Sequence, residues 1–201
     1  MNFLEFQKKY GHLPLIRSRD LVREIPHANA LRNQLRRWQS RNLVMKMRRG
    51  VYVLAGAKKP EVNWLANQLY APSYVSLESA LNFYGLIPER VADIVSVTTL
   101  KTLRFQNESG SFVYRHLKPA VFRGFKAVNS GKFSFLMADP EKALVDFFYF
   151  HLPAFAEDVE TVIQNSYRLQ NYEDLDTRKL RQWAALFDNA KLDRVVKRFC
   201  Q

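Results

Sequence analysis

The sequence predicts an α+β fold in which a basic helical head is followed by a mixed α/β region and a helical C-terminal portion. Apolar residues recur at helical spacing over much of the chain, and short runs of β-branched and aromatic residues interrupt them in the middle. The 201 residues include 47% hydrophobic and 13% aromatic residues, enough to build a folded core. The charge is uneven, because residues 1–56 contain 12 Lys/Arg and 3 Asp/Glu, or +9 of the total of +12. We therefore expect two domains, 1–56 and 57–201.

Three helices are expected in the head. The first runs from about Asn2 to Tyr10 and is broken by Gly11. Ser18 is expected to cap a short second helix that stops at Pro26. A third helix over about 27–42 has an apolar stripe at i, i+4 and i+7, formed by Leu31, Leu35 and Trp38.

A two-stranded hairpin is expected over 43–55, since apolar and β-branched residues flank a turn at Arg48-Arg49-Gly50. Three helices followed by a basic hairpin is the order of a winged helix-turn-helix domain. Residues 55–60 are the expected linker to the second domain.

The second domain begins with two expected helices, around 62–69 and 77–84, the latter capped by Ser76. Strands are expected at 94–98, 112–116 and 133–137, with turns at 107–110 and 129–132. Asp139-Pro140-Glu141 has the pattern of a helix start, and Lys142 and Asp146 are spaced to pair across one turn. Residues 156–201 are expected to be helical, with stripes around Val159–Ile163, Leu180–Phe187 and Leu192–Phe199.

The third helix is the candidate recognition element for nucleic acid. If its apolar stripe faces the core, the opposite face presents arginine and asparagine, whose paired donors and acceptors match guanine and adenine edges in the major groove. We expect residues early in this helix to read bases, later ones to hold the backbone, and basic residues of the hairpin to meet phosphates or the minor groove. The predicted base-reading residues are Asn29, Arg32, Asn33 and Arg36, the predicted backbone contacts are Arg37 and Arg41, and the predicted hairpin contacts are Lys46, Arg48 and Arg49.

Four segments together resemble one family. After the three-helix head come RRGVYVLA (48–55), PSYVSLESALNFYGLIPE (72–89), VSVTT (95–99) and ADPEKALVDFFY (138–149). Over roughly residues 10–150 the chain is similar to AbiEi-type antitoxins, the antitoxin halves of bacterial type IV toxin–antitoxin pairs, which are associated with phage defence. The resemblance implies a transcriptional autorepressor that binds inverted repeats in its own promoter as two copies of a protein monomeric in solution. It also implies a nucleotidyltransferase-like toxin as partner, with or without direct contact, and it assigns no residues to antitoxicity.

Motifs for catalysis or cofactor binding are missing from the sequence. Gly124 and Gly131 have the wrong spacing for a phosphate-binding loop, the four histidines and Cys200 lack zinc-ligand spacing, and no G-x-S-x-G or H-E-x-x-H occurs. Acidic side chains that could act in catalysis are Glu78, Asp93, Asp139, Glu141 and Asp146, with His116, and structural roles account for them better. We therefore expect no catalytic residues, metal or cofactor.

Two alternatives to the antitoxin remain open. One is a winged-helix transcriptional regulator whose C-terminal domain senses a ligand or partner, and the other is an enzyme acting on nucleic acid with the head as its targeting arm. The first ten residues lack the apolar core of a signal peptide and no apolar run approaches about 20 residues, so a cytoplasmic protein without membrane contact is expected.

Overall fold

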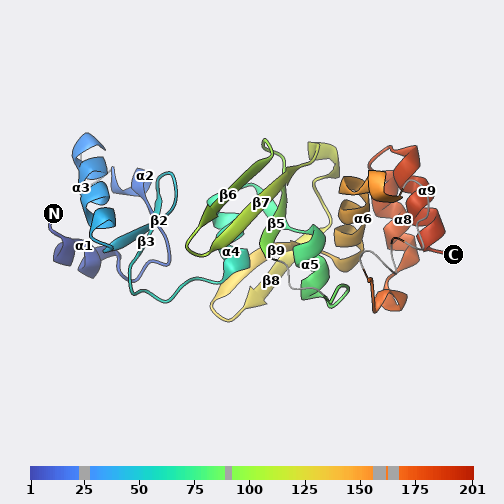
Figure 1. Cartoon of the computed structure of the whole chain (residues 1–201), viewed down its shortest axis with the longest axis horizontal. Coiled ribbons are helices and arrows are strands. Elements are labelled where there is room, and N and C mark those ends of the chain that lie inside the picture. The colour runs from blue at the N-terminus through green and yellow to red at the C-terminus, as the bar shows by residue number, and fades with distance from the viewer. Residues whose placement is uncertain (23–27, 89–91, 156–161, 163–167) are drawn as a thin grey trace. The chain divides into compact units, whose positions relative to one another are not determined.

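The computed structural model describes residues 1–22, 28–88, 92–155, 162 and 168–201 (Figure 1). Helices and strands both contribute to it, which confirms the predicted α+β class. The chain divides into two compact units, of which the first contains Met1–Val62 with Gln106–Gly110 and the second contains Asn63–Phe105 with Ser111–Gln201.

The first unit contains helices and the strands of a small sheet. Its elements are α1 (Phe3–Tyr10), β1 (Ile16–Arg17), α2 (Ser18–Leu21), α3 (Ala28–Ser40), β2 (Val44–Arg48) and β3 (Val51–Leu54). The three strands are antiparallel in the order β1-β3-β2, so the hairpin expected over 43–55 is present and gains a third strand. The predicted end of the second helix, at Pro26, lies outside the described residues.

Local sequence determines where α1 begins. The Asn2 side chain accepts a hydrogen bond from the backbone N–H of Glu5 at 2.9 Å, and Glu5 accepts one from the backbone N–H of Asn2 at 2.9 Å. This reciprocal pair is a capping box, which satisfies two backbone donors at the start of the helix. At α2 the expectation was wrong, because Ser18 is the first helical residue and Arg17 precedes the helix. The backbone N–H of Ser18 instead donates to the carbonyl of Gly50 at 2.8 Å, joining α2 to the hairpin turn.

One apolar core holds the first unit together. Phe6 lies 4.6 Å from the ring of Trp38, measured between ring centroids, so α1 packs on α3. Strand residues close the other side of this core. Its buried members are Phe6, Tyr10, Ile16, Leu21, Leu31, Leu35, Trp38, Val44 and Leu54.

The second unit is built around a mixed six-stranded sheet. Its helices are α4 (Val62–Leu69), α5 (Leu77–Phe83), α6 (Pro140–Phe150), α8 (Thr177–Ala185) and α9 (Ala190–Phe199), with shorter turns η1 (Pro119–Val121), η2 (Leu152–Phe155) and η4 (Tyr172–Asp174). Its strands are β4 (Ser73–Val75), β5 (Asp93–Thr98), β6 (Leu103–Asn107), β7 (Gly110–His116), β8 (Phe125–Ser130) and β9 (Phe133–Ala138).

The sheet has the strand order β6-β7-β5-β4-β9-β8. The pairs β4–β5 and β8–β9 are antiparallel, whereas β4–β9 and β5–β7 are parallel. Three of these strands, β5, β7 and β9, were expected from the sequence, and β4, β6 and β8 were not. The central position of β4 means that a three-residue strand links the two halves of the sheet.

Helix α6 is the core helix of this unit and packs against α5, α8 and α9 (Figure 1). Every residue from Glu141 to Phe148 is buried. The expected helical character of the C-terminal portion is confirmed for α8 and α9, and the stripe expected at Val159–Ile163 lies almost wholly outside the described residues.

Candidate nucleic-acid interface

Helix α3 has a fixed rotation about its axis because its apolar stripe is anchored in the core. Leu31 and Leu35 are each 1% exposed and Trp38 is 6% exposed. Burying three large side chains at i, i+4 and i+7 stabilises the unit by several kcal/mol, at about 1.5–3 kcal/mol for each. A rotation that hid the polar face would expose all three, so the opposite face must point to solvent.

The four predicted base-reading residues lie together on that opposite face. Asn29, Arg32, Asn33 and Arg36 are all exposed. At about 100° per residue, these positions fall within an arc of about 100° on the side of the helix away from the apolar stripe. Arg37, also exposed, lies about 40° beyond this arc on the same side of the helix, and exposed Arg41 follows the end of α3. The structure therefore gathers the predicted set on one surface, which we call the α3 face.

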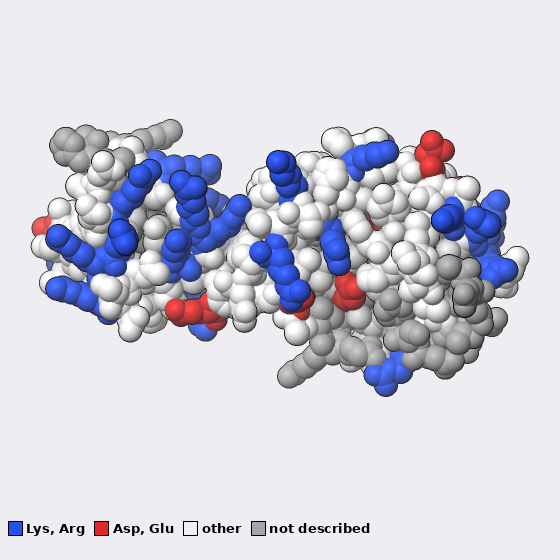
Figure 2. All heavy atoms as spheres, turned by 45° about the horizontal axis from the view of Figure 1, so that its top comes forward, with Lys and Arg blue, Asp and Glu red and all other residues white. Residues whose placement is uncertain are grey.

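The charge of the α3 face is uncompensated. Within the described part of the chain, no carboxylate forms an ion pair with Arg32, Arg36, Arg37 or Arg41. Arg32 and Arg36 are spaced i, i+4, where like charges destabilise a helix by about 0.2–0.5 kcal/mol. Figure 2 shows the wider setting, with Lys and Arg side chains gathered over the N-terminal unit and few acidic ones among them on the face in view. An anionic partner would relieve this repulsion.

The hairpin carries the other predicted residues. Lys46 on β2 and Arg49 in the turn are exposed, and Arg48 is half-buried. Gly50 has a φ of +78°, a conformation that glycine adopts without the strain of a side chain. A tight turn thus places Arg48 and Arg49 together at the end of the hairpin.

Sequence reasoning missed one basic residue of this sheet. Arg17 on β1 pairs with Val51, and Val51 also pairs with Arg48 on the other side. Directly paired residues share a face of a sheet, so the two arginines flank Val51 on the same face. The only sequence signal for strand β1 is the apolar pair Leu15-Ile16 before Arg17.

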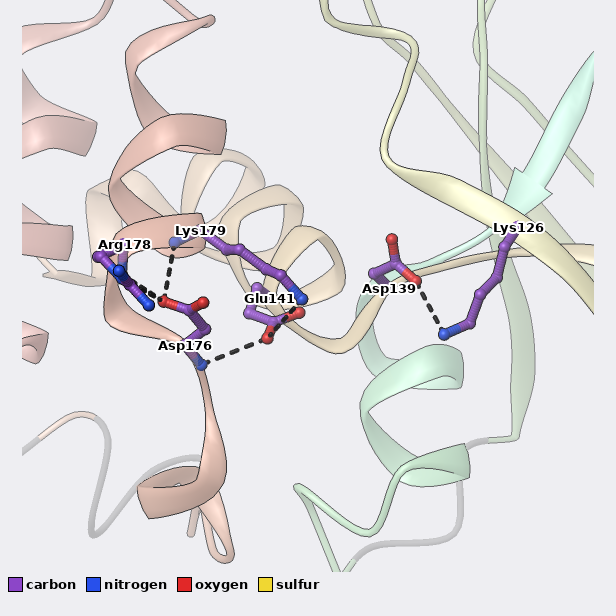
Figure 3. Close-up of polar contacts among 6 residues, drawn as sticks. All are labelled: Lys126, Asp139, Glu141, Asp176, Arg178 and Lys179. Atoms are coloured by element: carbon purple, nitrogen blue, oxygen red, sulfur yellow. Dashed lines mark hydrogen bonds and ion pairs between the residues drawn. The ribbon is translucent and has the colours of Figure 1, made fainter.

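Two of the acidic side chains weighed as catalytic candidates, Asp139 and Glu141, have cationic or backbone partners in the second unit (Figure 3). Asp139 is paired with Lys126 at 3.0 Å, and this hydrogen bond raises the pKa of Lys126. Glu141 lies 3.8 Å from Lys179 and accepts a hydrogen bond from the backbone N–H of Asp176 at 3.3 Å. Asp139 occupies the expected N-cap position of α6, but its carboxylate makes no capping hydrogen bond because Lys126 holds it.

Asp176 is a further carboxylate in this region, at the N-cap of α8. It accepts a hydrogen bond from the backbone N–H of Arg178 at 2.9 Å, and this bond lowers the pKa of Asp176. The N–H of Lys179 donates to the same oxygen at 3.4 Å. These contacts hold the carboxylates of Glu141 and Asp176 at the starts of α6 and α8.

Asp146 has a different environment, inside the protein. Lys142 and Asp146 form the predicted i, i+4 pair, and both side chains are 0% exposed. The Asp146 carboxylate also accepts from the hydroxyls of Tyr74 at 2.9 Å and Ser76 at 2.8 Å. Burial, and then Asp146, raise the pKa of Tyr74 well above its ordinary value. Ser76 therefore does not cap α5 as expected, because its hydroxyl is committed to this buried charge pair.

The remaining candidates also have partners. Glu78 lies 3.3 Å from Nε2 of His151, and Asp93 lies 3.1 Å from Arg104. Nδ1 of His116 is 2.9 Å from the carbonyl of Leu100. Among the described residues, no three His, Cys, Asp or Glu side chains are grouped closely enough to hold a metal ion.

Two comparisons of the sequence with known proteins found no match. No protein-family model matches the chain. No curated protein has significant sequence similarity to it. Across the described residues, no helix is both long enough and apolar enough to cross a membrane.

Proposed function

We propose that the chain binds double-stranded DNA through a winged helix-turn-helix formed by residues 1–56. Helix α3 is the recognition helix in the major groove, and the β2–β3 hairpin is the wing. The observation that carries this proposal is the α3 face, where arginine and asparagine are exposed directly opposite a buried apolar stripe. Element order and the excess of positive charge in this part of the chain support it.

The residues of the interface divide by role. Asn29, Arg32, Asn33 and Arg36 read base edges, since they lie in the first nine residues of α3 and carry matching donors and acceptors. Arg37 and Arg41 hold phosphates farther along the helix. The wing residues Lys46, Arg48 and Arg49 meet phosphates or the minor groove.

We further propose that the chain is an antitoxin that represses its own operon, binding promoter inverted repeats as two copies and counteracting a nucleotidyltransferase-like toxin. This part is supported by the resemblance of residues 10–150 to AbiEi-type antitoxins. The second unit would then provide antitoxicity.

Replacement of Arg36 tests the DNA-binding proposal. If Arg36 contacts a guanine, Arg36→Ala should weaken operator binding by about 1–3 kcal/mol and relax sequence preference. Lys8→Ala is the control, because Lys8 is an exposed cation of the same unit that lies on α1 and is not part of α3. Fluorescence anisotropy with labelled promoter DNA measures both variants. Equal small losses in both would remove Arg36 from the interface.

A second variant and the salt dependence separate the two kinds of contact. The double replacement Arg48→Ala/Arg49→Ala should weaken all DNA sequences nearly evenly, because phosphates carry no sequence information. With about six phosphates contacted, log affinity should fall with log salt at a slope of roughly −5. A slope near zero would contradict the assignment of the whole unit.

Co-expression tests antitoxicity separately. The full chain and its Arg32→Ala/Arg36→Ala variant are each expressed with a nucleotidyltransferase-like protein encoded beside it. Growth rescue by both proteins, with loss of repression only in the variant, is the expected result. Absence of rescue by the full chain would exclude the antitoxin role and leave DNA binding standing. If no such gene lies beside it, the regulator that senses a ligand becomes the better proposal.

A further inference from the structure

A cavity of about 830 Å³ lies in the C-terminal part of the second unit. Small-molecule sites range from about 300 to 1,000 Å³, so the cavity has the size of a ligand site. Its described lining combines apolar and basic side chains without an acidic one. The lining residues are Leu152, Pro153, Phe155 and Val195, with Asn189, Lys191, Arg194, Lys197 and Arg198.

Four of these side chains are cations from one helix, α9. Lys191, Arg194, Lys197 and Arg198 are all exposed. No carboxylate of the described chain forms an ion pair with any of them. Lys179 on the neighbouring helix α8 differs in this respect, because it has a carboxylate partner in Glu141. Among the described residues, the cavity is therefore bordered by positive charge that no carboxylate pairs with.

Helix stability accounts for only half of these cations. Lys197 and Arg198 lie in the last turn of α9, where the helix dipole favours positive charge. Lys191 is the second residue of the helix, where the dipole opposes a cation, and Arg194 is the fifth, where the dipole gives a cation no support. The side chain of Asn189 already accepts from the N–H groups of Lys191 and Leu192, so the side-chain cations, rather than bare N–H groups, are left for a ligand.

The apolar part of the lining narrows the ligand class. Leu152, Pro153 and Phe155 come from η2, the turn after α6, and Val195 comes from α9. A free inorganic anion would leave this apolar surface unused, whereas an organic phosphate with an aromatic group would use both parts. We propose that the cavity binds a small organic polyphosphate carrying an aromatic group, of the nucleoside triphosphate class.

Calorimetric titration of the full chain with ATP tests the inference. Saturable one-to-one binding is expected, and Arg194→Gln/Arg198→Gln should weaken it by at least about tenfold, since each lost charge-assisted hydrogen bond has at least this effect. The control Lys101→Gln/Arg181→Gln removes the same charge from exposed positions outside the cavity and should change affinity less than about twofold. Urea unfolding confirms that the variants remain folded. No saturable binding, or equal effects of the two variants, would overturn the proposal.

Two further probes test the ligand class. Inorganic tripolyphosphate and adenosine should each bind at least about tenfold more weakly than ATP, because each uses only one part of the lining. Tripolyphosphate binding as tightly as ATP would show that the apolar surface takes no part. Adenosine binding as tightly as ATP would show the same of the cations. Either result refutes the proposed class.

The outcome is separable from that of DNA binding. Arg194→Gln/Arg198→Gln should leave operator affinity within about twofold, and Arg36→Ala should leave ATP affinity within about twofold. If Arg36→Ala abolished ATP binding, ATP would be a ligand of the basic α3 face, which would overturn the cavity assignment without touching the DNA-binding proposal.

Discussion

The buried pair Lys142–Asp146 gives a strong test of what holds the second unit together. Both side chains are fully buried, and each oxygen of Asp146 has a donor. The Lys142 ammonium donates to Asp146 and also to the hydroxyl of Tyr74, at 3.0 Å. Removing one partner strands the other charge in the core, so Asp146→Leu should lower the free energy of unfolding by about 3–5 kcal/mol. That is a large part of the 5–15 kcal/mol typical of a whole domain.

Removing both charges should be less harmful than removing one. In Lys142→Met/Asp146→Leu no charge remains buried, and apolar groups of similar volume can replace an ion pair at little cost. Tyr74 and Ser76 still lose an acceptor, at about 1–3 kcal/mol each at most. We expect the double variant to be more stable than Asp146→Leu by at least about 2 kcal/mol.

Urea unfolding followed by tryptophan fluorescence measures these differences. Trp64 and Trp183 report on the second unit and Trp38 on the first, so the transition of the second unit alone should move. Asp93→Asn is the control, because it breaks the exposed pair with Arg104 and should cost less than about 1 kcal/mol. The single variant Lys142→Met completes the set. A loss in the double variant equal to the sum of the losses in Asp146→Leu and Lys142→Met would refute the reasoning, since it would show that the two charges do not interact.

Two further predictions concern the same region. Gly124→Ala should destabilise by roughly 2–5 kcal/mol, because φ is +80° and an added Cβ would lie 2.9 Å from Lys142 and 3.0 Å from Trp183. Gly131→Ala, with φ of +59° and nothing within 4 Å, should cost only about 1–2 kcal/mol, and equal losses in urea unfolding would contradict the close approach at Gly124. Burial raises the pKa of Tyr74, so the folded protein keeps a proton that the unfolded chain loses, and stability should fall as pH rises above about 10. Melting curves from neutral to alkaline pH measure this, and an unchanged melting temperature would refute it.

The spacing of apolar residues in the sequence was sufficient to predict a helix where one face of that helix is buried against a core. The stripe of Leu31, Leu35 and Trp38 predicted both the existence of α3 and the direction of its polar face. Predictions for α8 and α9 succeeded for the same reason, since each helix has one apolar side. The exposure of the α3 face followed from local pattern, and its role in binding DNA stays a prediction.

Two of the three strands missed in the second unit, β4 and β8, lack this signal, whereas β6 alternates between half-buried and exposed residues. Strand β4 has only three residues, all buried, and so shows no alternation of apolar and polar side chains. Strand β8 does not alternate, and all six of its residues are exposed or half-buried at the edge of the sheet. An alternating sequence pattern predicts a strand only when one face of the strand is buried and the other is exposed to solvent. Neither β4 nor β8 has one face of each kind.

Predictions of helix-capping side chains were wrong where the side chain binds a residue that is distant in the sequence. Ser76 and Asp139 stand at helix starts and were expected to cap them. Ser76 instead donates to Asp146, which is 70 residues away, and Asp139 pairs with Lys126, which is 13 residues away. A local sequence pattern does not reveal such partners. The Lys142–Asp146 spacing predicted the pair but not its burial, because burial depends on α5, α8 and α9 closing around α6.

The strand order of the second unit has a consequence for its biosynthesis. Val75 of β4 pairs with Met137 of β9, so the centre of the sheet joins segments about sixty residues apart and has high contact order. The core elements of the first unit lie within 54 residues of the N-terminus. On the ribosome, the first unit can complete its core while the second still lacks β9 and exposes unpaired strand edges. Between these two events the nascent chain is most prone to aggregation. The length of this interval is set by the synthesis of the residues up to Ala138.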